Sequence, residues 1–275
     1  MAKKLQRETA VLVRSDVHYG KRTPSYNPNI YRKRMAHLGE SLAQIRSLLS
    51  GGYDIRRLVI FELGDANDGT GIYPTQEHHQ AITNVERQAE ELATYDAAWY
   101  KEQAKVWGAV EVEAVPGNHG RAGRFAHEAA SWDLVYFQYL RLMLRGAVDV
   151  RFEREGDPFL RIVELWGHRY LLYHGHAIRM WSGIPWYGIQ IRVTRWATTG
   201  LAPLSACCFG HFHYYGEMPV NRTKALLTGT MVSSDEWALQ TMGYEAQNTW
   251  HLFGVGKSRP MTWHFGVDLT DGGRV

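Results

Sequence analysis

The sequence predicts a layered α/β fold, an α/β/β/α sandwich of two mixed sheets packed together with helices on the outside. Strand-like and helix-like segments alternate in the first half of the chain, and strand-like segments dominate the second half. Several strand-like segments are continuous apolar runs, which are typical of strands covered on both faces. The length of 275 residues is enough for one large domain with a substantial core.

The first half of the chain alternates between strand and helix patterns. Residues 10–16 form a short apolar run that leads into a polar loop, and residues 29–50 show helical spacing until two glycines end the pattern. Residues 57–69 predict a buried strand that ends in a Gly/Asp/Asn turn. Residues 75–106 predict one long helix or a helix pair, and residues 110–120 predict a strand followed by a Pro-Gly turn.

The second half begins with a helical pattern at residues 125–145. Residues 159–165 and 169–174 predict two strands joined by a compact hairpin connection, and residues 185–199 predict a helix. A strand around Cys207 and several short β segments follow. No internal repeat or linker-like segment divides the chain, so we expect one domain.

Composition excludes some classes of protein and leaves the partner open. The hydrophobic fraction of 45% and the charged fraction of 21% are those of a globular protein, and the net charge of +3 is too slight to indicate nucleic acid by itself. No apolar run approaches the roughly 18 residues of a membrane span, and the amino-terminal apolar stretch is too short for a signal peptide. We therefore expect a cytoplasmic protein with no membrane partner. The adjacent Cys207 and Cys208 would face opposite sides of a strand, which disfavours a mutual disulfide.

Residues able to bind metals follow the strand-like segments. The carboxyl ends of strands in layered α/β proteins meet at one rim, and a His-x-His pair in a strand directs both imidazoles to one side. A single His-x-His pair on a loop is solvated and without function in most proteins, but five coincidences of this kind predict a metal site. The residues concerned are Asp16 and His18, then Asp65, Asn67 and Asp68, then Asn118 and His119, then His174 and His176, and finally His211 and His213.

The motifs that contain these residues are SDVH, GDANDG, GNHG, YHGH and GHFH. Their order across residues 16–213 resembles that of the calcineurin-like metallophosphoesterase family. The opening SDVHYG and the long helical spacing before GNHG are similar to the DNA-repair exonuclease branch of that family. The resemblance implies one metallophosphoesterase domain over residues 1–275, with helical insertions at about 75–107 and 121–146. The residues after His213 suffice to complete the sheets and little more, so we expect a compact form without the further DNA-capping region of that branch.

The resemblance also implies two metal ions that share one carboxylate. It assigns Asp16, His18, Asp65 and His213 to the first ion, and Asp65, Asn118, His174 and His211 to the second. A bridging carboxylate such as Asp65 is physically reasonable, because it offsets the repulsion between two neighbouring cations. Nitrogen and oxygen donors without thiolate favour manganese, iron or zinc over copper or an iron–sulfur cluster. We expect Mn²⁺ first, with iron, zinc or nickel as alternatives, although the order of affinities alone would favour zinc.

The same resemblance gives His119 a catalytic role, either as a proton donor to the leaving alkoxide or as a stabiliser of charge on the phosphoryl group. The family's motif often ends in Asp or Glu, whereas this chain has Gly120, so either another carboxylate orients His119 or its role differs. Asn67 and Asp68 are expected to be hydrogen-bond partners of the ligands. Arg121 and His176 are either substrate contacts or ordinary surface side chains.

The reaction implied is phosphodiester hydrolysis, as in a nuclease, by a hydroxide that a dinuclear metal centre activates. The alternatives are a phosphomonoesterase, a small-nucleotide phosphodiesterase, and a non-catalytic scaffold, the last disfavoured because the implied ligands and His119 are all present. Residues 179–200 interleave arginines with aromatic residues, which suits single-stranded nucleic acid or, alternatively, ordinary core packing. The basic residues 19–34 beside the first motif favour a phosphate-rich substrate, with DNA and RNA as candidates.

Overall fold

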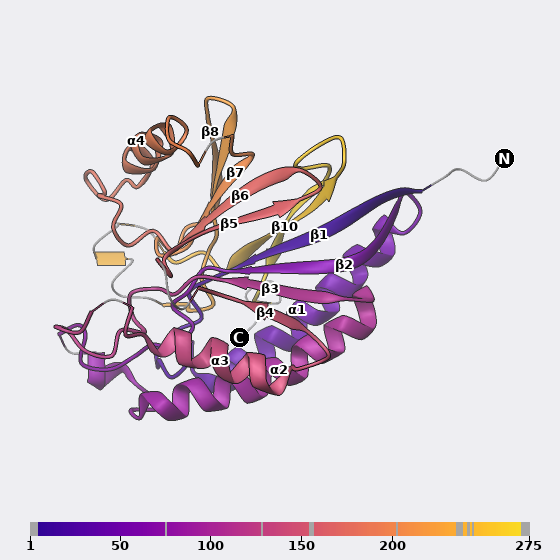
Figure 1. Cartoon of the computed structure of the whole chain (residues 1–275). Helices are drawn as coiled ribbons and strands as arrows, with labels where there is room; N and C mark the ends of the chain where they lie inside the picture. The colour runs from indigo at the N-terminus through magenta and orange to yellow at the C-terminus, as the bar shows by residue number, and fades with distance from the viewer. Residues whose placement is uncertain are drawn as a thin grey trace.

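The computed structural model describes residues 5–74, 76–127, 129–153, 157–201, 203–234, 239–240, 243 and 245–270. Its strands form two mixed sheets, which confirms the predicted fold class (Figure 1). In the larger sheet the order is β11-β10-β1-β2-β3-β4, where β1 to β4 run parallel and β10 and β11 are antiparallel. Its strands are β1 (Gln6–Arg14), β2 (Tyr53–Glu62), β3 (Val110–Ala114), β4 (Asp149–Arg151), β10 (Thr249–Gly256) and β11 (His264–Asp268).

The smaller sheet has the order β5-β6-β7-β9-β8. Its three central strands are parallel, and the two edge strands are antiparallel to their neighbours. The strands are β5 (Leu160–Leu165), β6 (His168–Tyr173), β7 (Ala206–Phe209), β8 (Gly216–Val220) and β9 (Thr223–Leu227).

Alternating side chains along the strands separate the core into layers. On β1, Ala10 and Leu12 face α1 (Pro28–Leu49), α2 (Val85–Trp107) and α3 (Trp132–Met143), whereas Val11 and Val13 face the smaller sheet. On β7, Cys208 packs between the sheets and Cys207 packs on the side of α4 (Trp186–Trp196). Helices therefore cover both outer faces, as the α/β/β/α prediction requires, and the two cysteines are free and buried.

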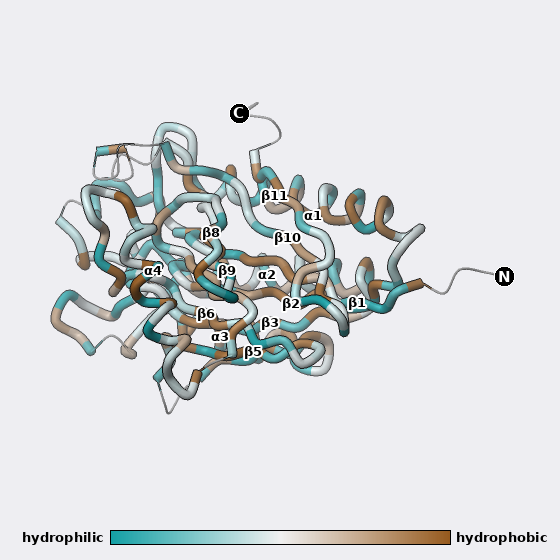
Figure 2. Tube along the Cα trace, turned by 90° about the horizontal axis from the view of Figure 1, so that it is seen from above, coloured by the Kyte–Doolittle hydropathy of each residue, from teal (hydrophilic) through white to brown (hydrophobic). Residues whose placement is uncertain are grey.

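Local sequence explains where the helices begin. The side chain of Asn27 accepts hydrogen bonds from the backbone N–H groups of Asn29 and Ile30, and Pro28 occupies the first turn of α1. Asn84 and Ser131 cap α2 and α3 in the same way. Hydrophobic and hydrophilic residues alternate along α1 in Figure 2, as expected for a helix with one face on the core.

Two predicted helices differ from those observed. The helical pattern at residues 75–106 corresponds to two helices, the short 3-10 helix η1 (Gln76–His79) and the long helix α2. Asn84 caps the start of α2. The helix predicted over 125–145 is shorter, because Ser131 caps it and α3 begins only at Trp132. Among the helices of the described residues, none has the length and apolar character that crossing a membrane would require.

Candidate metal centre

The predicted ligands lie together beyond the carboxyl ends of the parallel strands of both sheets. Asp16, Asp65 and Asn118 follow β1, β2 and β3 of the larger sheet, and His174 and His211 follow β6 and β7 of the smaller one. These strand ends converge near the centre left of Figure 1. The site therefore lies where the two sheets meet at one rim.

The first group of donors consists of Asp16, His18 and His213, each of which offers an atom within 4.8 Å of the others. The Nε2 atoms of His18 and His213 are 3.1 Å apart, and His213 Nε2 lies 3.2 Å from Asp16 Oδ1. Within the described part of the chain, Asp16 Oδ1 is buried and makes no hydrogen bond. A carboxylate oxygen and two imidazole nitrogens directed at one point fit a divalent cation.

The second group consists of Asp65, His174 and His211, again within 4.8 Å, and Asn118 adjoins it. His174 Nε2 lies 3.0 Å from Asp65 Oδ2 and 2.9 Å from Asn118 Oδ1. On the other side of the ring, His174 Nδ1 donates to the carbonyl oxygen of Leu63 at 2.7 Å, which directs Nε2 into the site. Tyr73 accepts a hydrogen bond from Asn118 Nδ2 at 2.6 Å and so turns Asn118 Oδ1 towards His174.

Asp65 lies between the two groups, where a bridging ligand is expected. One carboxylate oxygen is 3.0 Å from His174 Nε2 and 4.0 Å from His18 Nε2, while the other accepts the backbone N–H of His119 at 2.7 Å. Burial is the largest single influence and opposes ionisation of Asp65, but the charges of His174, His119 and His18 and the hydrogen bond from His174 together hold the pKa of Asp65 well below its ordinary value. Burial is the largest single influence and lowers the pKa of His174, but the charges of Asp65 and Asp16 and the hydrogen bonds to Asp65 and Leu63 together raise it to about 9.

The same environment keeps His211 neutral. Burial, followed by the charge of His174, lowers the pKa of His211 well below its ordinary value. A neutral imidazole has a free lone pair, which is the form that binds a metal.

The backbone of the site is strained at the ligand positions. Nine non-glycine residues in the described chain have positive φ, and five of them are predicted ligands. Such conformations cost free energy and persist where the surrounding structure holds them, commonly at functional sites. The five are Asp16, His18, Asp65, His211 and His213.

His119 lies beside both donor groups, and its side chain is 21% exposed. Its Nδ1 atom is 3.1 Å from the carbonyl oxygen of Asp68, 3.6 Å from Asp68 Oδ1 and 3.4 Å from Gln76 Nε2. The ring also packs edge-on against His18 at a centroid distance of 4.5 Å. Asp68 is thus the carboxylate next to His119 in this chain, where Gly120 supplies none.

Asp133 is a buried carboxylate that the motifs do not include. It accepts the backbone N–H groups of Asp65 and Gly117, both at 2.9 Å, and the backbone and side-chain amides of Asn67 at 3.2 and 3.1 Å. A Cβ atom at Gly120 would lie 2.8 Å from the Asp133 carboxylate, so Asp133 fills the space that a larger residue at 120 would need. Sequence reasoning missed Asp133 because most of its partners are backbone amides; its only sequence signal is the Ser-x-Asp start of α3.

The other predicted residues take different positions. Arg121 folds back on the turn and donates from Nε to the carbonyl oxygen of Asn118 at 3.1 Å. His176 is half-buried, with its ring 5.6 Å from Phe159 and 5.8 Å from His174. Asp68 and Asn67 contact His119 and Asp133 as described above, and no predicted site residue lies far from the others. The metal-binding and catalytic roles of all these residues stay predictions.

Comparisons with known proteins give only distant likenesses. No protein-family model and no curated protein matches the chain. Among solved structures, a novel archaeal phosphodiesterase has a TM-score of 0.42 at 10% identity and covers 94% of this chain and 99% of its own. A hypothetical protein from Pyrococcus horikoshii OT3 has a TM-score of 0.45 at 12% identity and covers 96% of this chain and 92% of its own. Vacuolar protein sorting 29 from Cryptosporidium parvum has a TM-score of 0.42 at 12% identity and covers 90% of this chain and 86% of its own. Since these TM-scores are below 0.5, the function is inferred from the chain's own residues.

Proposed function

We propose that the protein is a metal-dependent phosphodiesterase of the calcineurin-like type, acting as a nuclease through a dinuclear metal centre. The observation that carries the proposal is the placement of Asp65 between two Asp/His groups, with His119 beside both. The first ion would be held by Asp16, His18, Asp65 and His213, and the second by Asp65, Asn118, His174 and His211. The oxygen and nitrogen donors suit manganese, iron or zinc, of which we propose Mn²⁺.

Among the chain's own residues, His119 can protonate the leaving group of a phosphodiester. When bound, two divalent cations supply positive charge for the phosphoryl oxygens and favour ionisation of a water molecule. The water molecule gives up one proton to solvent, and its oxygen forms a bond to phosphorus as the P–O bond to the leaving group breaks. His119 Nδ1 donates a hydrogen bond to the Asp68 carbonyl and keeps its proton, so the doubly protonated ring transfers the proton on Nε2 to the leaving alkoxide and becomes a neutral imidazole. The products are a phosphomonoester and an alcohol.

The test compares hydrolysis of bis-p-nitrophenyl phosphate with that of p-nitrophenyl phosphate by the purified full chain in Mn²⁺. We expect the diester to be preferred, and elemental analysis to find about two metal ions per chain. Asp65→Asn should abolish turnover. The control is His168→Asn, which changes a histidine at the start of β6, the end of that strand opposite His174, and it should not alter turnover. Turnover of the monoester alone would favour the phosphomonoesterase alternative, and no turnover of either would favour a scaffold.

A further inference from the structure

We propose that a pocket beside the metal centre binds single-stranded nucleic acid, which names the substrate class of the proposed phosphodiesterase and rests on that function. We call it the arginine–aromatic pocket. It has a volume of about 600 Å³, within the range of small-molecule and cofactor sites. It is formed by the loop after His176 and by α4, and the residues that matter for binding are Arg179, Trp181, Tyr187, Ile191, Arg192 and Arg195.

The pocket adjoins the loop that carries His176, which lies beside the metal centre. Its first lining residue, Ala177, directly follows His176, whose ring lies 5.8 Å from that of the predicted ligand His174. A ligand in the pocket is therefore next to the proposed site of hydrolysis.

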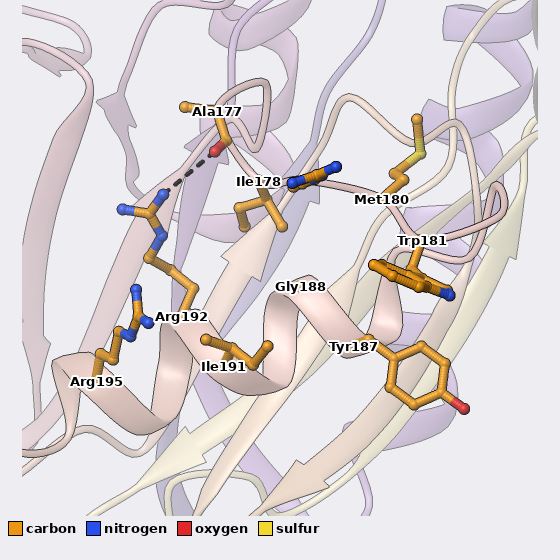
Figure 3. Close-up of a pocket in the computed structure, with 10 residues that line it drawn as sticks. Ala177, Ile178, Met180, Trp181, Tyr187, Gly188, Ile191, Arg192 and Arg195 are labelled. Carbon is orange, nitrogen blue, oxygen red and sulfur yellow. Dashed lines mark hydrogen bonds between the residues drawn. The ribbon is translucent and has the colours of Figure 1, made fainter.

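Cationic and aromatic side chains lie at opposite ends of the pocket. Figure 3 shows Arg192 and Arg195 together at one end of α4 and Trp181 and Tyr187 at the other, with Ile191 between them. Arg192 is oriented by a 3.2 Å hydrogen bond from Nη2 to the carbonyl oxygen of Ala177. Guanidinium groups bind phosphates and aromatic rings stack on bases, so the two ends match the two parts of a nucleotide chain.

The pocket's segment of the chain is positively charged although the whole protein is nearly balanced. Residues 165–216 contain no Asp or Glu, and three of their arginines line the pocket. The whole chain carries a formal charge of only +3. The pocket therefore has three arginines in a segment without acidic residues, which favours binding of a polyanion.

Exposure distinguishes pocket residues from core residues within the same stretch of sequence. Trp181 and Tyr187 are 65% and 59% exposed, whereas Trp186 and Trp196 pack against the buried core of the smaller sheet. Core packing therefore explains the presence of Trp186 and Trp196, but it does not explain the exposed Trp181 and Tyr187. Exposed aromatic residues that gather beside arginines indicate a binding surface.

The shape of the pocket is built into the backbone. A Cβ atom at Gly188 would lie 2.2 Å from the carbonyl oxygen of Arg179, so glycine allows the loop to pack directly on α4. Tyr187, Ile191 and Arg195 follow at intervals of four residues on the exposed face of α4, while Ile189 and Val193 are buried on the other. Eight residues of helix span ~12 Å, about the length of three stacked nucleotides.

The experiment measures binding without catalysis. Fluorescence anisotropy of a fluorescein-labelled oligothymidylate is titrated with the full chain in EDTA, and Trp181→Ala, Tyr187→Ala and Arg195→Ala are compared with wild type. We expect each variant to bind about tenfold more weakly, and Arg195→Ala to show a smaller salt dependence. The matched controls are Arg145→Ala, in the loop before β4, and Trp166→Ala, in the β5–β6 turn; both should bind as wild type does.

Equal binding by wild type and all three pocket variants would overturn the proposal. So would binding to phosphatidylserine vesicles in place of the oligonucleotide, because the pocket would then be a membrane surface. Failure of the proposed function is seen separately, as absence of diester hydrolysis by wild-type protein in Mn²⁺.

Discussion

At the scale of single residues, the surroundings of His119 show which carboxylate lies beside it, although Gly120 stands where the motif that the chain resembles often has Asp or Glu. Gly120 offers no side chain, but Asp68 lies beside Nδ1 of His119 and also 3.4 Å from Nδ1 of His18. Burial opposes ionisation of Asp68, but hydrogen bonds from His119 and His18 outweigh burial and keep the pKa of Asp68 below its ordinary value. An ionised Asp68 can therefore orient both imidazoles.

Replacing His119 distinguishes its two candidate roles. His119→Gln should lower kcat by about 10²-fold on a dinucleotide, whose alkoxide leaving group needs a proton, and by less on bis-p-nitrophenyl phosphate, whose leaving group does not. Metal content should stay unchanged, since His119 is not a predicted ligand. An equal loss on both substrates would instead support stabilisation of phosphoryl charge.

Asp133 is expected to hold the turns that carry Asp65 and Asn118. Asp133→Asn replaces one accepting oxygen by a donor that faces other donors, and we expect it to lower the free energy of unfolding by about 1–3 kcal/mol. Urea denaturation in EDTA measures this, and Asp149→Asn on the exposed β4 is the control. A change no larger than that of the control would show that the hydrogen bonds of Asp133 are dispensable.

His251 predicts a pH dependence of stability. Burial and the charge of His264 lower the pKa of His251 to about 3. Because the unfolded imidazole takes up a proton near pH 6.5 and the folded one does not, stability is complete above pH 6.5 and falls as the pH drops towards 3.

Between pH 7.5 and 5.5, wild type should lose about 1 kcal/mol more than His251→Gln, as measured by urea denaturation at both pH values. Titrating groups away from His251 are shared by the two proteins and cancel in the comparison, whereas His264, which lies 2.7 Å from His251, contributes to the difference as part of the pair. Parallel pH profiles would rule out this role of His251.

At the scale of elements, a buried polar network joins the helical layer to the strand ends that carry the first two motifs. Arg14, at the end of β1, pairs with Asp96 of α2 at 2.7 Å and lies 3.2 Å from Glu62 at the end of β2. Tyr31 of α1 and Tyr136 of α3 also donate to Asp96. Burial raises the pKa of Glu62 to about 8, against the opposing charge of Arg14, so Asp96 is the main counter-charge of Arg14 at neutral pH.

Removing Asp96 should therefore leave a buried, unpaired guanidinium. We expect Asp96→Ala to lower the free energy of unfolding by about 3–5 kcal/mol. Glu102→Ala on the same helix, which removes only an exposed pair with Lys105, should change it by less than about 0.5 kcal/mol. Chemical denaturation compares the two, and similar values for both would contradict the importance of the network.

At the scale of the whole molecule, the candidate centre joins the two sheets. Asp16 and His18 follow β1 of the larger sheet, while His174 and His213 belong to the smaller one. Metal binding should therefore stabilise the packing of one sheet on the other, because ligands from both must be in place at once.

Adding Mn²⁺ to metal-free protein should consequently raise Tm. At about 100 times Kd the stabilisation is about 2.7 kcal/mol, a rise of roughly 5–10 °C for a chain of this size. Thermal unfolding with and without Mn²⁺ tests this, and Asp65→Asn should show no such rise. A rise of the same size in both proteins would place the metal elsewhere.

The sequence by itself determined the fold class and the set of residues that gather at the strand ends. Strand and helix periodicity are local properties, and parallel strands of one sheet necessarily bring their carboxyl ends to one side. The positions of Asp16, Asp65 and Asn118 directly after such strands are therefore sufficient to predict that they lie together.

Only the tertiary structure decided which distant side chains support that set. The carboxylate of Asp133 under the ligand turns, Asp68 beside His119, and the exposure of Trp181 against the burial of Trp186 all depend on how separate segments pack. Such features leave no periodic signal in the sequence. Contacts to backbone amides, and the burial of one aromatic residue rather than another, depend on packing between segments and not on the order of residues within a segment.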